Sequence, residues 1–252
     1  MYTYRLTISY DGTRYRGWQR QQNTEQTIQW VIEKNLSEIL GRKVHIGGSG
    51  RTDSGVHAFA QEASVVLGQR MDTEAVFRKI NELLPEDIRV LRIQEMQGQF
   101  HARKSACAKC YEYYVDLRDK PDVFTRRYRF HFPKKIDVEA MRRAAKRLEG
   151  KHDFASFTDL KDSNDTVRTI YEIGIEKTGN QLRISYLGNG FLYHMVRILT
   201  GTLLEVGAGR IAPEEMGAIL MAKDRTWSGF PASAKGLFLK QVYYEPIEQM
   251  EK

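Results

Sequence analysis

The chain has few cysteines and no long apolar run, and both absences narrow what it can be. Cys107 and Cys110 are the only two cysteines in 252 residues. Their C-x2-C spacing suits a zinc knuckle, but no second Cys or His pair follows at ligand spacing, so we expect no bound metal. No stretch of 18 apolar residues occurs, and Met1 leads directly into a strand pattern. We therefore expect a soluble, cytoplasmic protein that does not enter a membrane.

Size and composition allow a sizeable core without disulfides. The 252 residues fit one large domain or two small ones, and 41% of them are hydrophobic. Lys and Arg number 39 against 32 Asp and Glu, which gives a net charge of +7. A basic chain is a candidate partner for polyanions, but a balance of this size is weak support by itself. Whether the chain binds a polyanion therefore has to be judged from the positions of its arginines.

The apolar pattern of the first half predicts the order strand, helix, strand, strand, helix, strand. The first strand alternates apolar and polar residues and ends at Asp11-Gly12, and the first helix has one apolar face and stops at Gly41. Asp72 or Thr73 caps the second helix, which turns Val76, Ile80 and Leu83 inward. The predicted strands are 4–10, 44–46, 61–67 and 88–93, and the predicted helices are 27–40 and 73–84.

The second half repeats this order with different residues. Its predicted strands are 105–117, 166–176, 182–187 and 237–244, and its predicted helices are 137–148, 191–206 and a short one at 213–221. Each half is thus a β-α-β-β-α-β unit. The predicted fold class is α+β, a tandem of two ferredoxin-like (RRM-like) units over 1–100 and 101–252. We expect a cleft between their helix-free faces, which suits an extended polyanion.

The glycine-rich stretch from Gly47 to Ala58 is the most informative part of the chain. Asp53 lies among four glycines, with Arg51 two positions before it. Glycines let the backbone approach a ligand closely. The plain structural interpretation is a turn that Asp53 caps, with Arg51 in solvent. A phosphate-binding loop is excluded, because the G-K-[ST] ending is absent and a central aspartate repels an anion.

A lone carboxylate beside an arginine also suits nucleophilic catalysis, because the arginine keeps the acid ionised. Glycoside hydrolysis usually needs two carboxylates, and besides Asp53 this region offers only Glu62, one strand away. A reaction that breaks a glycosidic bond without water as a reactant needs only one acid. The loop therefore favours such a reaction over hydrolysis.

Two stretches interleave arginines with aromatic residues, Arg14–Gln22 and Thr125–His131. Arginines bind phosphates, while aromatic rings and guanidinium planes stack on unpaired bases. For either stretch alone, a solvated turn is as good an interpretation as an RNA-binding segment. Together with the glycine-rich loop they favour looped or single-stranded RNA, bound in the cleft. The predicted RNA contacts in the first stretch are Arg14, Arg16, Trp18 and Arg20.

Several of these stretches together resemble the bacterial tRNA pseudouridine synthase A family over nearly the whole chain. Six blocks occur in the family's order, which chance does not produce. The blocks are Tyr10–Thr13 with Gly17–Gln21, Gly50–Ala58, Phe100–Arg103 with Ser105-Ala106, Tyr111 and Tyr113, His152–Phe157, and Asn189–Leu192 with His194–Arg197.

The resemblance implies a role for each of several residues. Asp53 is the nucleophile, Arg51 helps to hold the flipped-out nucleotide, and Tyr111 stacks on the target uracil. Arg197 pairs with Asp53, and Arg103 joins the RNA surface. The residues themselves support these roles unevenly. Tyr111 lies on a strand face of the kind that is more often core than ligand contact, whereas an arginine in a stretch as apolar as that around Arg197 needs a partner such as a carboxylate.

The resemblance also implies the reaction and the partners. The substrate is tRNA, in which uridines at positions 38 to 40 of the anticodon arm are converted to pseudouridine. No metal or cofactor is needed, because the product is an isomer, and the enzyme is a homodimer with RNA lying across both subunits. Three routes stay open: Asp53 attacks C1′ of the ribose, it attacks C6 of the uracil, or it assists formation of a glycal.

The sequence departs from the family pattern at Gly229–Ala234 and at Cys110. Both departures keep an alternative open, a relative that modifies another tRNA position or ribosomal RNA. The rivals from other classes are an RNA-binding module without catalysis and a hydrolytic nucleosidase. For His57 and His194 we favour structural roles over acid or base roles, because no proton in the reaction is tied to either.

Overall fold

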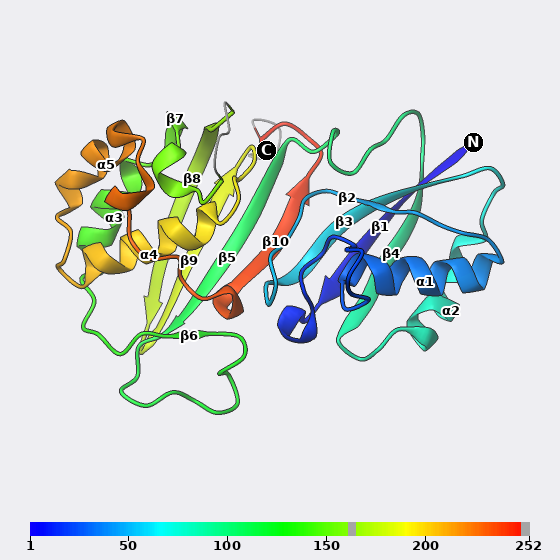
Figure 1. Ribbon diagram of the computed structural model, residues 1–252, viewed down its shortest axis with the longest axis horizontal. Helices are drawn as coiled ribbons and strands as arrows, with labels where there is room; N and C mark the ends of the chain where they lie inside the picture. The colour runs from blue at the N-terminus through cyan, green and yellow to red at the C-terminus, as the bar shows by residue number, and fades with distance from the viewer. Residues whose placement is uncertain (161–164, 248–252) are drawn as a thin grey trace. The chain divides into compact units, whose positions relative to one another are not determined.

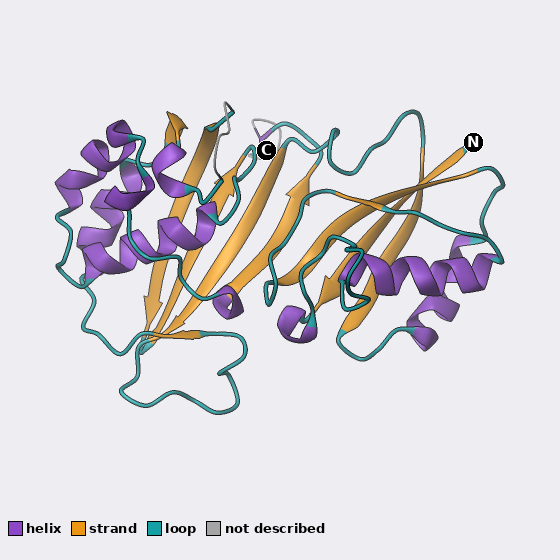
Figure 2. Ribbon diagram, viewed as in Figure 1, coloured by secondary structure: helices purple, strands orange, loops and turns teal. Residues whose placement is uncertain are grey.

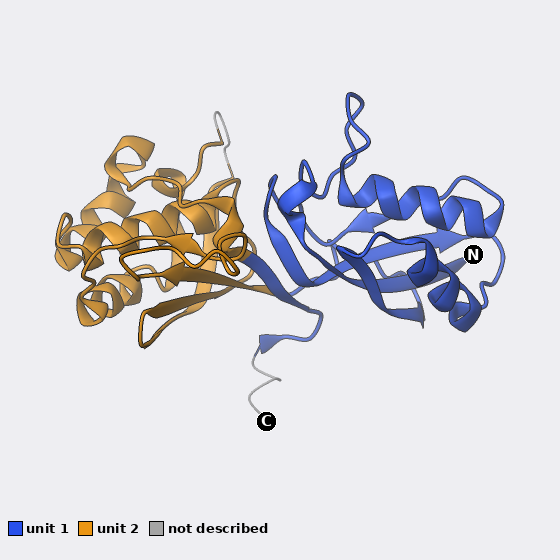
Figure 3. Ribbon diagram, turned by 90° about the horizontal axis from the view of Figure 1, so that it is seen from below, with its two compact units in different colours: residues 1–107, 238–252 blue, residues 108–237 orange. Residues whose placement is uncertain are grey.

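The computed structural model describes residues 1–160 and 165–247, which form an α+β fold, as predicted (Figure 1). The chain divides into two compact units (Figure 3). Unit 1 is residues 1–107 together with the segment that starts at Phe238, and unit 2 is Ala108–Leu237. The predicted boundary at 100/101 differs from this division chiefly in the last strand, which belongs with the N-terminal half.

Unit 1 contains four long strands and two helices. Its sheet has the order β4-β1-β3, with β1 antiparallel to both neighbours, and β2 and β10 both pair with β3. The last strand joins in parallel through Phe238 opposite His57 and Leu239 opposite Ala58. The elements are β1 (Tyr2–Tyr10), η1 (Gly12–Arg14), α1 (Ile28–Leu40), β2 (Gly47–Gly48), β3 (His57–Leu67), α2 (Thr73–Leu83), β4 (Ile88–Met96) and β10 (Leu237–Tyr243).

Local sequence signals explain these elements. Strand β1 alternates as predicted and buries its apolar side chains Tyr4, Leu6, Ile8 and Tyr10. Helix α1 starts where the Thr27 side chain accepts a hydrogen bond from a backbone N–H of the first turn. It ends at Gly41, whose φ of 61° is a left-handed conformation that suits glycine. Asp72 caps α2, one of the two predicted alternatives.

Unit 2 has a sheet of the order β5-β9-β8-β7, in which β6 also pairs with β5. Figure 2 shows its helices grouped beside its strands. The elements are β5 (Ala108–Asp116), β6 (Phe130–His131), α3 (Val138–Lys146), β7 (Gly150–Asp153), η2 (Ala155–Phe157), β8 (Val167–Thr178), β9 (Gln181–Gly188), α4 (Met195–Gly207), η3 (Pro213–Glu215), α5 (Met216–Ala222), η4 (Arg225–Trp227) and η5 (Ala234–Gly236). Within residues 1–160 and 165–247, no helix is long and apolar enough to cross a bilayer.

The two units share the arrangement of three strands that the ferredoxin-like prediction requires. In unit 1 the first strand, β1, lies beside β3, and β2 pairs with β3. In unit 2 β5 corresponds to β1, β8 to β2 and β9 to β3: β5 lies beside β9, and β8 pairs with β9. The tandem of similar α+β units is therefore confirmed, with β7 as an addition that the sequence pattern did not predict.

Three local predictions were wrong. Residues 44–46 are not a strand: Val44 and Ile46 are buried in an irregular segment, and the short strand starts at Gly47. The helix predicted from 191 begins only at Met195, because His194 before it has a left-handed φ of 60°. Leu83, expected to face inward, is 36% exposed at the last turn of α2.

Candidate active site

Asp53 lies between β2 and β3 in the segment Ser49–Val56, called here the Asp53 loop. Main-chain atoms close its turn, since the N–H of Val56 donates to the carbonyl of Asp53 at 3.1 Å. Gly55 follows with a φ of 77°, in the left-handed region. The Asp53 side chain is half-buried. The loop thus fixes the backbone of the acid without enclosing its side chain.

The segment Tyr10–Trp18 holds one side of the Asp53 loop. The backbone N–H of Trp18 donates to the carbonyl of Thr52 at 3.1 Å, and the N–H of Gly55 donates to Tyr15 at 3.3 Å. The hydroxyls of Tyr10 and Thr52 form a buried hydrogen bond of 2.7 Å. Contacts therefore reach the residue before the acid and the second residue after it, and they leave Asp53 little freedom to shift.

Two glycines make this close approach possible. A Cβ on Gly12 would stand 2.0 Å from the carbonyl oxygen of Val56. A Cβ on Gly17 would stand 2.6 Å from the carbonyl oxygen of Thr52, at a φ of +92° that other residues rarely adopt. Both distances are below any real contact. The glycines of the Tyr10–Trp18 segment are thus needed for the position of Asp53.

Gln61 of strand β3 holds the start of the Asp53 loop. Its side chain is fully buried. Its Oε1 accepts from the hydroxyl of Ser49 at 2.7 Å, and its Nε2 donates to the carbonyl of Gly50 at 3.1 Å. A buried amide with both ends paired is a rigid support. The loop is consequently anchored to the sheet as well as to the Tyr10–Trp18 segment.

Glu62, the second carboxylate of this region, is committed elsewhere. Arg5 donates to both of its oxygens, at 2.8 and 2.9 Å, and the hydroxyl of Thr7 donates to one of them at 3.0 Å. The Glu62 side chain is only 4% exposed. Glu62 is therefore held in a buried ion pair with Arg5.

Arg51 is exposed, and its Nε donates to Oε1 of Gln19 at 3.3 Å. This contact orients the guanidinium group at the surface of the Asp53 loop. A guanidinium group presented in this way can bind a phosphate or a nucleotide oxygen. The structure thus places Arg51 two residues from Asp53 on the same anchored loop.

Tyr111 lies on β5 of unit 2 and is 8% exposed. Its ring meets the ring of Phe191 edge-on, with 5.3 Å between centroids. Tyr113 and Val115 on the same strand face are fully buried. All three side chains of this strand face are therefore buried, and Tyr111 keeps the largest exposed fraction of the three. The hydroxyl of Tyr113 donates to the carbonyl of Ser233 at 2.6 Å.

Arg197 lies on the first turn of α4, and its Nε donates to the carbonyl of Ala232 at 2.7 Å. The N–H of Ala232 returns a bond to the carbonyl of Arg197 at 2.9 Å. Burial raises the pKa of Tyr113, and the positive charge of Arg197 opposes that rise, which places Arg197 in electrostatic range of β5. The segment Gly229–Ala234, where the sequence departs from the family pattern, is therefore the one that orients Arg197.

Both histidines in question have structural contacts. His57 is 1% exposed, stacks on Phe238 at 4.5 Å and accepts at Nδ1 from the N–H of Gly12 at 3.1 Å. His194 pairs through Nδ1 with Asp159 at 2.7 Å, and Arg225 donates to the same carboxylate at 2.8 Å. Burial opposes ionisation of Asp159, but these two hydrogen bonds outweigh it and lower its pKa. The contacts favour structural roles for both residues.

The predicted RNA arginines are all exposed, but two of them have carboxylate partners. Arg14 pairs with Asp87 at 2.6 Å, and Arg20 pairs with Glu33 at 3.0 Å. Arg16 and Arg103 are exposed without a side-chain contact that limits them to one geometry in the described residues. Paired surface arginines still reach phosphates, because a partner at one edge leaves other N–H groups of the guanidinium.

Trp18 differs from its arginine neighbours. It is 1% exposed, and a Cβ on Gly48 would stand 2.3 Å from its indole nitrogen. The prediction of an RNA contact for Trp18 is therefore wrong for the structure as it stands, because a buried ring cannot stack on a base. The sequence does not reveal this, since the burial depends on a glycine 30 residues away. Trp18 acts through the packing of the Asp53 loop.

Cys107 and Cys110 are half-buried, and neither forms a disulfide. Among residues 1–160 and 165–247, no cluster of three or more His, Cys, Asp or Glu side chains could hold a metal ion. The supports of the Asp53 loop, above all Gln61, Thr52 and Gly17, were missed by sequence reasoning. The available signal was the pair Gly12 and Gly17, at the start of η1 and shortly after it, which predicts a close backbone approach but not the segment that is approached.

Comparisons with known proteins show which family the chain belongs to. The sequence pattern of the family described as tRNA pseudouridine synthase matches residues 6–103 and 144–245. The protein named tRNA pseudouridine synthase A from Bacillus sp. (strain KSM-64) is 43% identical over 245 residues, which cover 97% of this chain and 100% of that protein. The protein of the same name numbered 1 in Protochlamydia amoebophila (strain UWE25) is 42% identical over 250 residues, covering 97% of each chain.

Among solved structures, a chain from the crystal structure of a Cbf5-Nop10-Gar1 complex aligns with a TM-score of 0.42 and 12% identity, covering 94% of this chain and 48% of that one. The sequence matches are far stronger and extend over both units. They include Asp53 and its loop within the first matched range. The chain therefore belongs to the tRNA pseudouridine synthase family.

Proposed function

We propose that this chain isomerises uridine to pseudouridine in the anticodon arm of tRNA, at positions 38 to 40, with Asp53 as the nucleophile. Membership of the family supports the reaction, and one observation supports the residue. The backbone of Asp53 is anchored by the Tyr10–Trp18 segment and by Gln61, while its side chain is not enclosed. Positioning of this kind is what a nucleophile needs, because a fixed reacting group lowers the entropy cost of reaction.

The chemistry balances without a cofactor. The target base first leaves its stack. The Asp53 carboxylate then attacks C1′ of the ribose or C6 of the uracil, or assists formation of a glycal, and the bond between N1 and C1′ breaks. The base rotates, C5 bonds to C1′, the proton of C5 is lost and N1 gains one. Because the product is an isomer and the carboxylate is regenerated, neither an oxidant nor water is consumed.

The other site residues follow from the resemblance, residue by residue. Arg51 binds the flipped nucleotide, Tyr111 stacks on the target uracil and Arg197 pairs with Asp53. The exposure of Arg51 and the fixed geometry of Arg197 against Ala232 support these roles. Tyr111 is 8% exposed and packs against Phe191, so stacking on the uracil requires the base to reach a ring that is largely buried.

The proposal extends to the RNA surface and to assembly. Arg14, Arg16, Arg20 and Arg103 contact phosphates of the tRNA, and the enzyme works in the cytoplasm as a homodimer. Sedimentation at micromolar concentration tests the assembly. We expect a species of twice the 29.2 kDa chain mass, and a single 29.2 kDa species would contradict the dimer.

The experiment that tests the reaction uses tRNA carrying tritium at C5 of uridine. Isomerisation releases tritium to water, because C5 forms the new bond, and it yields no free uracil. A nucleosidase releases free uracil instead, and a binding module releases neither. We expect tritium release without free uracil. Ribosomal RNA labelled in the same way tests the alternative substrate, and release from it rather than from tRNA would contradict the proposal.

A further inference from the structure

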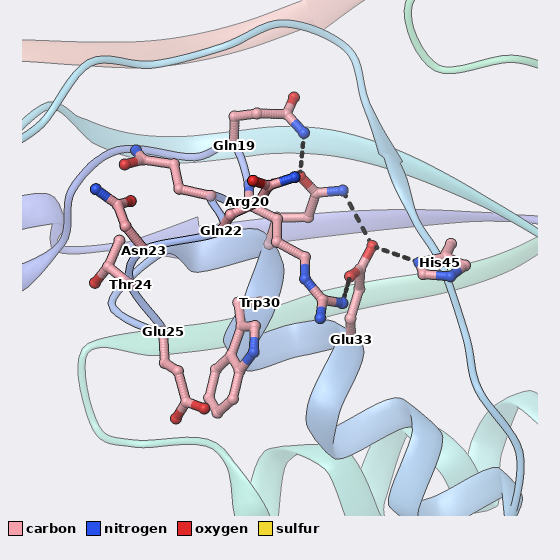
Figure 4. Close-up of a pocket in the computed structure, with 11 residues that line it drawn as sticks. Gln19, Arg20, Gln22, Asn23, Thr24, Glu25, Trp30, Glu33 and His45 are labelled. Atoms are coloured by element: carbon pink, nitrogen blue, oxygen red, sulfur yellow. Dashed lines mark hydrogen bonds and ion pairs between the residues drawn. The ribbon is translucent and has the colours of Figure 1, made fainter.

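Unit 1 contains a cavity next to the Asp53 loop that the proposed reaction does not use (Figure 4). It has a volume of about 790 Å³ and lies between the segment Gln19–Glu25, the first turns of α1 and His45. Sites for small molecules or single nucleotides typically measure about 300 to 1,000 Å³. We call this space the amide cavity, because carboxamides are the commonest polar side chains in its lining. The carboxamides are Gln19, Gln21, Gln22, Asn23 and Gln29.

The chemistry of the lining suits a nucleobase. Carboxamides offer a donor and an acceptor side by side, which matches the hydrogen-bonding edge of a base. The indole of Trp30, a half-buried side chain of α1, provides an aromatic surface in the same cavity. Base and indole stack without regard to sequence, while the amides read the edge. An anion without a base would find few charged partners here.

One buried acid shapes the cavity but does not repel RNA from it. The Glu33 side chain is 3% exposed. It accepts from Nε2 of Gln29 and from the N–H of Ile46, each at 3.0 Å, and from Nη1 of Arg20 at 3.0 Å. Its charge is therefore compensated. Arg20 remains 44% exposed at the rim and has further N–H groups with which to bind a phosphate.

A chain of hydrogen bonds links the amide cavity to the Asp53 loop. Arg51 donates through Nε to Oε1 of Gln19 at 3.3 Å. The Nε2 of Gln19 donates to Oε1 of Gln29 at 2.7 Å, and Gln29 contacts Glu33. The arginine assigned to the flipped nucleotide thus shares a side-chain network with the cavity floor. This link is the reason for seeking a ligand of the cavity in the RNA that carries the target.

We propose that the amide cavity binds a second nucleotide of the RNA substrate, unstacked from its neighbours, with its base on Trp30 and its phosphate on Arg20. The proposal rests on the proposed function for the identity of the ligand as substrate RNA. The protein would then recognise a second nucleotide of the RNA in addition to the target uridine. The proposal also explains why α1 buries a polar pair, Gln29 and Glu33, on a face that otherwise carries apolar residues.

The test uses the full-length Asp53→Asn protein, so that the complex with tRNA persists without turnover. Trp30→Ala is added to this background, with Trp30→Phe as the conservative variant. The matched control is Trp227→Ala, which removes an indole that is 57% exposed in unit 2. Trp30 lies on a helix in which alanine is favourable, so the variant should fold, and thermal unfolding verifies this. Fluorescence anisotropy gives the tRNA affinity, and chemical probing gives the reactivity of each base in the complex.

We expect Trp30→Ala to weaken tRNA binding about tenfold, which lies within the effect of losing one base–aromatic stack. Trp30→Phe should recover most of this loss, and Trp227→Ala should change nothing. One base other than the target uridine should be protected in the complex and become reactive again with Trp30→Ala. Unchanged affinity and an unchanged protection pattern in Trp30→Ala would overturn the proposal. So would Trp30-dependent binding of free nucleoside monophosphates without any effect on tRNA.

These outcomes separate the two proposals. If wild-type protein releases no tritium from labelled tRNA while the Trp30-dependent protection is present, the reaction is wrong and the second nucleotide site stands. If tritium is released and the protection pattern does not depend on Trp30, the second site is wrong and the reaction stands.

Discussion

Asp53 is the residue on which the proposed reaction depends, and its structural alternative is a turn cap. Asparagine separates the two roles, because it keeps the shape and can accept a hydrogen bond at a cap, but it cannot act as the nucleophile. As a cap, Asp53→Asn should cost no more than about 1 kcal/mol of unfolding free energy and leave activity intact. As a nucleophile, its loss should reduce turnover by at least about a thousandfold.

We expect the thousandfold loss with tRNA binding retained, since the arginines are untouched and one negative charge is removed. Pseudouridine formation and tRNA affinity are measured on the same folded Asp53→Asn preparation. Turnover above about a tenth of the wild-type rate, in a protein that unfolds normally, would rule out Asp53 as the nucleophile.

Gly17 tests whether the position of the Asp53 loop matters as much as its acid. Alanine at this position needs an unfavourable φ of +92° and brings Cβ to 2.6 Å from the carbonyl oxygen of Thr52. The backbone before Asp53 has to move. We expect Gly17→Ala to lose about 1 to 3 kcal/mol of unfolding free energy and most of its turnover.

Gly68→Ala is the matched control, because a Cβ there meets nothing within 4 Å. Chemical denaturation and turnover are compared for both variants. If Gly17→Ala turns over at the rate of Gly68→Ala, the contact between the Tyr10–Trp18 segment and the loop does not position the acid.

At the scale of elements, the sequence predicted what short-range periodicity controls. The alternation of β1 and the apolar face of α1 were found because their residues repeat at the period of the element. Strand β7, Gly150–Asp153, has no such alternation and was missed. The start of α4 was placed too early because the left-handed His194 interrupts an apolar run. The order of elements was therefore predictable, while their ends were not.

In the candidate site, too, features set by neighbouring residues could be predicted from the sequence, and features set by contacts between distant segments could not. Asp53 and Arg51 could be proposed as site residues from the sequence, because glycines, an acid and a base stand close together in it. The burial of Trp18 and the commitment of Glu62 to Arg5 were not found, because both depend on contacts between distant segments. Periodicity also could not predict that Gln29 and Glu33 of α1 are buried. Long-range packing decides which polar residues become supports and which become ligands.

The segment between β5 and β6 gives an element-scale prediction for acid conditions. Asp116 at the end of β5 is 4% exposed and accepts from Nε and Nη2 of Arg118, each at 2.8 Å. These hydrogen bonds outweigh burial and lower the pKa of Asp116 from 3.8 to about 2. A carboxyl group with a lower pKa in the folded state stabilises the fold above its unfolded pKa. That stability is lost as the pH falls from about 4 towards about 2.

We expect this loss to be on the order of 1 kcal/mol, because solvent screens the partly exposed Arg118. Urea unfolding at steps between pH 6 and pH 2.5 measures it. Asp116→Asn should lower the unfolding free energy near neutral pH. It should also reduce, by the same amount, the decrease in unfolding free energy at acid pH (the acid limb), to which other carboxyl groups still contribute. An acid limb of equal slope in both proteins would mean that Asp116 does not titrate in this way.

At the scale of the whole molecule, the number of basic residues, 39 Lys and Arg, overstates the positive charge that is available to RNA. Several arginines already have acidic partners, among them Arg5 with Glu62, Arg14 with Asp87 and Arg20 with Glu33. Such pairs reduce the local positive potential, so total charge is a poor measure of RNA affinity. Affinity must instead come from arginines gathered where the substrate lies. We expect Arg14, Arg16 and Arg20 to meet that condition, because the ion pairs of Arg14 and Arg20 leave other N–H groups of each guanidinium for phosphates.

Replacement of Arg14, Arg16 and Arg20 by alanine should therefore weaken tRNA binding and also reduce its salt dependence. Each phosphate contact contributes roughly 0.7 to 0.9 to the slope of log affinity against log salt, so the slope should fall by about 2 to 3. The control replaces Arg70, Arg78 and Lys79, three exposed basic residues at and before α2, and removes the same charge. If net charge alone mattered, both triple variants would bind alike, whereas contact with phosphates predicts a loss only for the first.

Arg20→Ala also leaves buried Glu33 without its arginine partner, so thermal unfolding of the triple variant is checked. Arg16→Ala alone provides a variant that leaves the fold untouched. Wild-type affinity and slope in both the triple variant and Arg16→Ala would show that RNA does not cross this surface.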